Sequence, residues 1–234
     1  MRRIRPLLMS MRGQVMDEAY PGAMEHIDVV WARDPFHVLI STVLSQRTRD
    51  QNTYNASKAL FARFDTPAEI AAADVDELVE LVRPAGFPQV KAKAIKEICR
   101  RLHQDFDDQV PSDIDVLLTF PMVGRKTANC VLSYGFGIPA ICVDTHVHRI
   151  CNRIGLVTTA SPDETEVALR EIAPKELWCD INAVMIRFGQ RICLPRRPRC
   201  HSCSVRAECD YFSALPDDDE RKSENIELIN RASR

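Results

Sequence analysis

The chain of 234 residues has little net charge, no long apolar run and few signs of β structure. No stretch approaches the roughly 18 consecutive apolar residues that span a bilayer, so we expect no membrane helix and no membrane partner. Strand-like alternation is scarce, and the Asn-Gly and Asp-Gly pairs that mark tight hairpins are absent. A formal net charge of −2 does not indicate a nucleic-acid partner, so any basic surface for one must be local.

The N-terminus does not read as a signal peptide, because the apolar part of residues 1–9 is too short. Of the nine cysteines, five are scattered through apolar segments and are predicted to be reduced core thiols: Cys99, Cys130, Cys142, Cys151 and Cys179. A reduced interior predicts a cytoplasmic protein.

The hydrophobic pattern of the sequence predicts an all-α protein. Apolar residues recur at helical spacing over residues 75–82 and 94–102. The apolar run of residues 38–44 alone fits a strand, but it lies in a longer stretch after Pro35 and is predicted to be a buried helix. The charged residues from Pro216 to Arg234 favour a mobile tail or a frayed helix.

Four cysteines near the C-terminus have the spacing C-x6-C-x2-C-x5-C: Cys193, Cys200, Cys203 and Cys209. So short a segment does not accommodate two disulfides, but it can wrap four thiolates around one metal centre. Zinc and a [4Fe–4S] cluster both accept four cysteine thiolates, and the spacing alone does not choose between them.

Residues 117–129 predict a helix, a tight turn and a second helix. Pro121 ends the first helix, and Gly124 lets the backbone approach a bulky partner. The N–H groups that open the second helix suit a phosphate, although an ordinary helical corner has the same pattern. Lys126 lies in the first turn of that helix, where the helix dipole and Arg125 both disfavour its charged form. A neutral lysine is a nucleophile, and the alternative is a phosphate-binding or solvated lysine.

Asp144 precedes a helix whose apolar stripe includes Val147 and Ile150, so it is predicted to be the N-cap. A capping carboxylate stays ionised because backbone N–H groups bind it. Asp144 is therefore either a cap alone or a cap that also presents a fixed carboxylate to a cleft.

These motifs together resemble the endonuclease III family of DNA glycosylases, within the helix-hairpin-helix superfamily. The matching segments are residues 120–128, residues 143–147 and the cysteine quartet, and the likeness extends from about Asp34 to Cys209. The cysteine spacing is the family's [4Fe–4S] pattern, so the resemblance implies that cluster.

The resemblance implies two all-α lobes. A six-helix barrel would occupy residues 28–139 and end in the helix-hairpin-helix motif at about 115–132. Residues 1–27 with 140–213 would form the cluster lobe, and residues 214–234 would be the charged tail. Lys126 would come from one lobe and Asp144 from the other.

The implied activity is removal of oxidised pyrimidines from duplex DNA, followed by strand cleavage. Lys126 would attack C1′ of an extruded nucleotide and form a Schiff base, and β-elimination would follow. Asp144 would activate the lysine or stabilise positive charge on the sugar. The implied partner is double-stranded DNA with damaged bases or abasic sites, bound by a monomer that is nucleoid-associated if its source is prokaryotic.

The resemblance also assigns residues that contact DNA. The gap left by the extruded base would be filled by Gln46 or Arg47, since the alignment shifts by one residue, unless both are solvated. Phe87 would wedge into the duplex or anchor its loop in the core. The hairpin residues Val123, Gly124 and Arg125 would bind the backbone. A basic run without acidic residues, from Arg187 to Arg206, would bind phosphates through three arginines of the cysteine loop: Arg196, Arg197 and Arg199.

The chain departs from the family pattern at Met122, which replaces the first glycine of Gly-Val-Gly. A methionine there is strained if the position needs a positive φ. Two alternatives remain: a mismatch-specific glycosylase that leaves the strand uncut, and a non-catalytic iron–sulfur protein that binds DNA.

Overall fold

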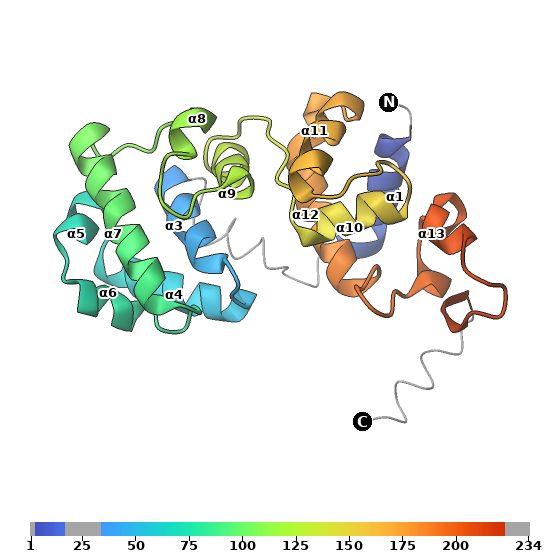
Figure 1. Ribbon diagram of the computed structural model, residues 1–234, viewed down its shortest axis with the longest axis horizontal. Helices are drawn as coiled ribbons and strands as arrows, with labels where there is room; N and C mark the ends of the chain where they lie inside the picture. Colours follow the sequence, from blue (N-terminus) through green and yellow to red (C-terminus); the bar gives the residue numbers. More distant parts are fainter. Residues whose placement is uncertain (1–2, 17–33, 223–234) are drawn as a thin grey trace, which may run out of the picture. The chain divides into compact units, whose positions relative to one another are not determined.

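The computed structural model describes residues 3–16 and 34–222, which form helices and loops without any strand. The prediction of an all-α protein is therefore confirmed for this part of the chain. The predicted start of the barrel at residue 28 and the predicted tail beyond residue 222 lie outside the described residues. The chain divides into two compact units (Figure 1), residues 21–140 and residues 1–20 with 141–234. Each unit has its own hydrophobic core. None of the described helices is long and apolar enough to cross a bilayer.

The unit of residues 21–140 is built around helix α3 (Pro35–Ser45). This helix begins where the Asp34 carboxylate accepts hydrogen bonds from the N–H groups of Phe36 (2.7 Å) and His37 (3.4 Å). Pro35 suits the first turn because a helix start needs no N–H donor there. Residues 38–44 are all buried, so the prediction of a central helix rather than a strand is confirmed.

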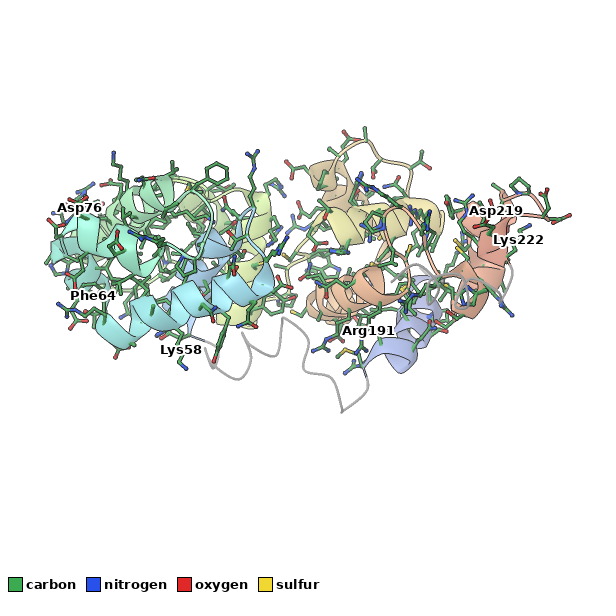
Figure 2. The ribbon with its side chains drawn as sticks, turned by 90° about the horizontal axis from the view of Figure 1, so that it is seen from below. Lys58, Phe64, Asp76, Arg191, Asp219 and Lys222 are labelled. Atoms are coloured by element: carbon green, nitrogen blue, oxygen red, sulfur yellow. The ribbon has the colours of Figure 1, made fainter. Side chains whose placement is uncertain are left out.

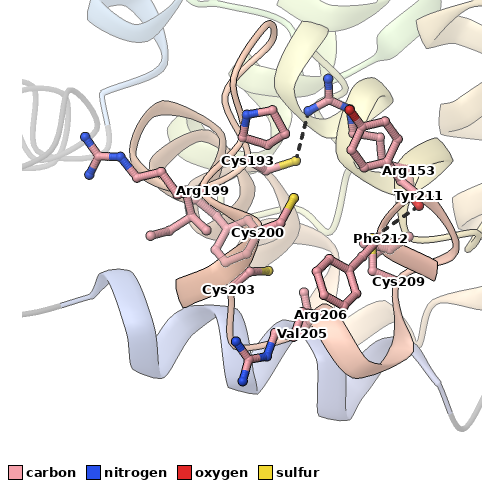
Figure 3. Close-up of a pocket in the computed structure, with 14 residues that line it drawn as sticks. Arg153, Cys193, Arg199, Cys200, Cys203, Val205, Arg206, Cys209, Tyr211 and Phe212 are labelled. Carbon is pink, nitrogen blue, oxygen red and sulfur yellow. Dashed lines mark hydrogen bonds between the residues drawn. The ribbon is translucent and has the colours of Figure 1, made fainter. Parts of the chain in front are cut away.

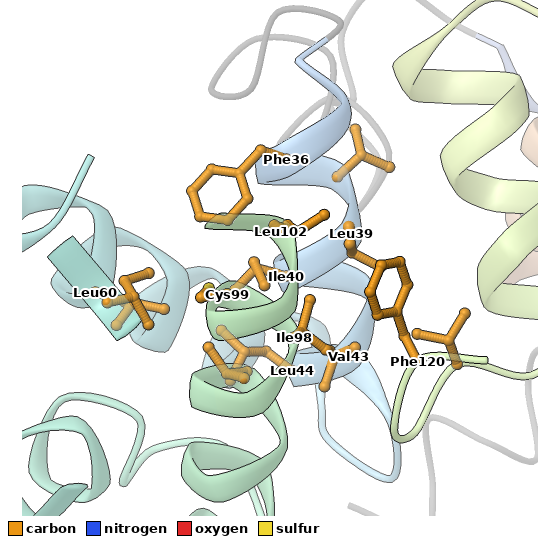
Figure 4. Close-up of a cluster of buried hydrophobic side chains, with 14 of the residues drawn as sticks. Phe36, Leu39, Ile40, Val43, Leu44, Leu60, Ile98, Cys99, Leu102 and Phe120 are labelled. Carbon is orange, nitrogen blue, oxygen red and sulfur yellow. The ribbon is translucent and has the colours of Figure 1, made fainter. Parts of the chain in front are cut away.

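Helix α3 packs against α4, α7, α9 and the π-helix η1. Figure 4 shows its side chains interleaved with those of α7, where Ile98, Cys99 and Leu102 lie on the buried face. Lys58 of α4 and Asp76 of α6 are exposed and point outward (Figure 2). The remaining helices of this unit are α4 (Asp50–Arg63), α5 (Pro67–Ala72), α6 (Val75–Leu81), α7 (Pro88–Asp105), α8 (Ile114–Leu117), α9 (Arg125–Cys130) and η1 (Val131–Gly135).

In the other unit, helix α12 packs against both α1 and α10. At Gly189 of α12 the approach of α10 is so close that a Cβ there would stand 2.4 Å from His146 Nδ1. The helices of this unit are α1 (Ile4–Val15), α10 (Thr145–Arg153), α11 (Pro162–Ile172), η2 (Lys175–Leu177), α12 (Trp178–Arg191), η3 (Cys200–Ser202), η4 (Arg206–Glu208), α13 (Asp210–Ser213) and η5 (Glu220–Lys222).

The prediction of reduced core cysteines is confirmed for Cys99 and Cys151, which are free and buried. Burial raises the pKa of the Cys151 thiol to about 12, so it stays protonated. The prediction is wrong for Cys130 and Cys142, which are disulfide-bonded. Apolar flanks along the sequence indicate burial, but they do not reveal which thiols meet in the fold.

Candidate functional site

The predicted hairpin is present between α8 and α9. Helix α8 ends at Leu117, and Arg125 begins α9 after a turn that brings the Val123 N–H to the Phe120 carbonyl (3.2 Å). Val123 is buried, so it stabilises the turn. Gly124 is exposed, and a Cβ there would meet nothing within 4 Å, which leaves room for a partner's backbone.

Met122 has φ 60°, so the position where the family pattern has glycine does require the left-handed conformation. The prediction that methionine is strained there is confirmed. The strained turn is fixed from outside, because Gln46 Nε2 donates a hydrogen bond to the Met122 carbonyl at 2.7 Å.

Lys126 lies in the first turn of α9, as the sequence predicts, and its side chain is half-buried. Its neighbour Thr127 is buried, and the Thr127 hydroxyl lies 3.4 Å from Gln46 Nε2. The end of α3 is thus bonded to the helix that carries Lys126. The chemical role of Lys126 stays a prediction.

Gln46 and Arg47 differ in what they can reach. The Gln46 amide is directed to the hairpin, whereas Arg47 is exposed and has φ 51°. Of these two neighbours, Arg47 is therefore the one whose side chain is presented to solvent.

An open hollow of about 340 Å³ lies beside these residues, and part of its rim is apolar. Phe87 is 57% exposed, so it does not anchor its loop in the core, and Val90 is 56% exposed. The residues that line the hollow are Gln46, Arg47, Phe87, Val90, Lys91 and Met122.

Lys91 is a residue of this site that the sequence predictions missed. Its side chain is 1% exposed, and its ammonium donates to Leu44 O, Gln46 O and Thr48 Oγ1, each at 2.7 Å. Its position on the buried stripe of α7, four residues before Ile95, was the available signal. A lysine on an apolar stripe is buried only when its charge is satisfied.

Asp144 belongs to the other unit and is the N-cap of α10, as predicted. Its Oδ1 accepts hydrogen bonds from the N–H groups of His146 (2.8 Å) and Val147 (2.9 Å). One carboxylate oxygen is therefore fixed by the helix start, which orients the group.

The four quartet cysteines line one pocket with apolar side chains that include Val205 and Phe212 (Figure 3). Burial raises the pKa of Cys200 to about 11 and that of Cys203 to about 12, so without a metal these thiols stay protonated. No group of three or more Cys, His, Asp or Glu among the described residues is arranged to hold a single metal ion.

Two arginines of α10 hold the start of the cysteine loop, and the sequence predictions missed both. Arg149 donates to Cys193 O (2.8 Å) and Gly189 O (3.1 Å). Arg153 donates to Cys193 Sγ (3.4 Å) and Leu194 O (2.7 Å). The helix that Asp144 caps is thus bonded to the segment that carries the first quartet cysteine.

The predicted basic run is smaller than the sequence suggests. Arg196, Arg197 and Arg199 are exposed, but Arg187 is buried, with 7% of its surface accessible. Helix α12 turns Arg187 inward, so it is not part of a phosphate-binding surface.

Comparison with known proteins identifies the family. The HhH-GPD superfamily of base excision DNA repair proteins matches residues 40–175. Endonuclease III of Thermotoga maritima is 51% identical over 179 residues, which cover 76% of this chain and 84% of that protein.

Two solved structures of endonuclease III with DNA have the same fold. A non-covalent complex is 36% identical, with a TM-score of 0.80 over 91% of this chain and 96% of the other. A trapped covalent intermediate is 35% identical, with a TM-score of 0.79 over 91% and 96% of the two chains. The chain belongs to the endonuclease III family, within the HhH-GPD superfamily of base excision DNA repair proteins.

Proposed function

We propose that this DNA glycosylase removes oxidised pyrimidines from duplex DNA and then cleaves the strand as an abasic-site lyase. The observation that carries the proposal is Lys126 in the first turn of α9, two residues after an exposed Gly124 that leaves space for a DNA backbone. A primary amine at that place can form a covalent intermediate, which a glycosylase limited to hydrolysis does not need.

The proposed chemistry begins when the damaged nucleotide leaves the stack. The Lys126 amine forms a bond to C1′ as the bond between C1′ and the base breaks, and the base leaves with a proton. The sugar ring opens to a Schiff base, and loss of a C2′ proton expels the 3′ phosphate by β-elimination. Asp144, fixed as a helix cap, would accept the amine proton or stabilise positive charge on the sugar.

We propose that the quartet cysteines hold a [4Fe–4S] cluster. Each thiolate of such a cluster binds a different iron, so the four sulfurs stand farther apart than around one zinc ion. The four cysteines line one pocket, which supports a shared metal centre, and their family spacing supports the cluster rather than zinc. When bound, the cluster would cross-link the loop, and the loop arginines would bind phosphates. Purified protein should contain about four irons and four sulfides per chain, and zinc in their place would contradict the assignment.

For the gap left by the extruded base, we propose Arg47 rather than Gln46. The Gln46 amide is bonded within its own unit, whereas the exposed Arg47 lies at the hollow beside Phe87. A guanidinium and an apolar wedge together can fill a gap and separate base pairs. We propose duplex DNA with a damaged base or an abasic site as the substrate, bound by a monomer.

Borohydride trapping tests the proposal, because it reduces a Schiff base to a stable enzyme–DNA adduct. Wild-type protein should give the adduct on abasic and oxidised-pyrimidine duplexes, and Lys126→Ala should abolish it. Lys93→Ala, at an exposed lysine of α7 in the same unit, is the matched control and should trap normally.

Absence of an adduct with wild-type protein would refute the lyase. Release of normal thymine or adenine from a mispair, with the strand intact, would instead indicate a mismatch glycosylase. Tight DNA binding without turnover on any lesion would indicate a non-catalytic binding protein.

A further inference from the structure

Lys91 is a fully buried cation that the proposed chemistry does not use. An ammonium has three N–H donors, and all three are engaged at 2.7 Å by Leu44 O, Gln46 O and Thr48 Oγ1. The two carbonyls lie at the C-terminal end of α3, where the helix dipole favours a positive charge. The positive charge of Lys91 is thus satisfied by one short segment, residues 44–48.

That turn has an unusual conformation. Arg47, between two of the groups that Lys91 binds, has φ 51°, which costs a non-glycine residue energy. The Thr48 hydroxyl also lies 3.1 Å from the Gln46 carbonyl, so the Lys91 ammonium closes a small network around Arg47. The hydrogen bonds of the Lys91 ammonium therefore offset the energetic cost of the left-handed conformation at Arg47.

The same lysine joins the turn to the Phe87 loop. The Lys91 N–H donates to the Phe87 carbonyl at 3.1 Å, while its side chain binds the turn. A Cβ at Gly86 would lie 3.4 Å from Arg47 O, so the two loops are in close contact. Arg47 and Phe87, the exposed cation and the exposed ring, are therefore held relative to each other through Lys91.

We propose that Lys91 is a positioning residue that holds the turn of residues 46–48 in the form that enters duplex DNA when a nucleotide is extruded. The inference rests on the proposed function. Without the ammonium, the buried Leu44 carbonyl loses this donor and the half-buried Gln46 carbonyl keeps only the Thr48 hydroxyl, so the strain at Arg47 loses its compensation. The turn then samples other conformations, and each insertion into the duplex has to restore the original one.

The test compares Schiff-base trapping on two abasic substrates, a duplex and a single strand. A single strand has no gap in a base stack to fill, so only the reaction on the duplex depends on the turn of residues 46–48. Lys91→Met should slow single-turnover trapping on the duplex by about tenfold, which is ~1.4 kcal/mol of activation free energy. Trapping on the single strand should change less than about twofold.

Lys96→Met is the matched control, because Lys96 lies on the same helix and donates to the Ala73 carbonyl away from the hollow. It should leave both rates unchanged. Thr48→Val removes a single acceptor of the Lys91 ammonium and provides a second variant if Lys91→Met does not fold. It should slow the duplex reaction in the same direction by a smaller factor.

Equal losses on both substrates, or Lys91→Met and Thr48→Val indistinguishable from Lys96→Met, would overturn the positioning role while leaving the proposed function intact. No adduct from wild-type protein on either substrate would instead overturn the proposed function, and the inference with it.

Discussion

Gly189 is the point at which a single methyl group should disturb both the Asp144 helix and the cysteine loop. In Gly189→Ala the new Cβ would stand 2.4 Å from His146 Nδ1 and 2.9 Å from Arg149 Nη2. The first distance is 1.0 Å below the 3.4 Å at which ordinary contact begins. The clashing atoms belong to side chains of α10, so either the His146 ring turns aside or α10 moves away from α12.

The magnitude follows from what that movement disrupts. Overpacking a closed contact costs about 1–3 kcal/mol. Losing the Arg149 bonds to Cys193 O and Gly189 O costs about 1.5–3 kcal/mol, because the donor is charged. Alanine returns about 1 kcal/mol of helix propensity. The net loss is about 1.5–5 kcal/mol, and at about 2–4 °C per kcal/mol the melting temperature should fall by roughly 3–20 °C.

The assay is thermal unfolding followed by circular dichroism, with Gly13→Ala as the matched control. Gly13 lies in α1 of the same unit, and a Cβ there would meet nothing within 4 Å. That variant should therefore gain about 1 kcal/mol from helix propensity alone. If Gly189→Ala melts at or above the wild-type temperature, α10 is not held closely by α12, and the link from Asp144 to the cysteine loop fails.

Two further predictions concern charge. Burial lowers the pKa of Lys91 from 10.5 to about 8. Between those two pH values the unfolded chain keeps a proton on Lys91 that the folded protein has lost. The free energy of unfolding of the wild type should therefore rise with pH relative to that of Lys91→Met. A difference between the two proteins that stays constant from pH 8 to 10.5 in urea titrations would contradict this prediction. The logarithm of the DNA-binding constant falls with the logarithm of the salt concentration, and alanine at Arg196, Arg197 or Arg199 should each make this fall less steep by about 0.9. Fluorescence anisotropy on duplex DNA measures this slope. Alanine at Arg100, which is paired with Glu97, should leave that slope unchanged.

The predictions that succeeded depend on local physics. Asp144 is recognisable as an N-cap because a cap binds N–H groups two and three residues ahead. The strain at Met122 followed instead from the resemblance, because the family pattern has glycine at this position and the structure gives it a φ of 60°. The helix at residues 38–44 followed from the longer stretch after Pro35 in which the apolar run lies, since the run alone also fits a strand.

The features that were missed depend on contacts between distant segments. Gln46 binds Met122 across 76 residues, and Lys91 binds Gln46 across 45. Neither spacing has a sequence signature, because the fold alone brings the partners together. Arg187 shows the opposite error: its charge indicated a surface position, but the register of α12 buries it.

The positions of the residues with left-handed backbone conformation indicate that the hollow is a binding site rather than a packing defect. Outside glycine, the described residues with positive φ are Arg47, Phe87, Asp107, Asp108 and Met122. Aspartate tolerates this conformation, and the two aspartates lie in a turn after α7. The other three residues all line the hollow. At about 1–2 kcal/mol of conformational strain each, they raise the free energy of the folded state by about 3–6 kcal/mol. That is a large part of the roughly 5–15 kcal/mol by which a domain is stable. Strain of that size persists where the surroundings impose it, and here the surroundings are identifiable: Lys91 holds Arg47, and Gln46 holds Met122. A surface with no binding role would have no reason to retain three strained backbone positions around one hollow, whereas a rigid arrangement of the exposed Arg47 and Phe87 with the half-buried Met122 suits the separation of base pairs that we propose.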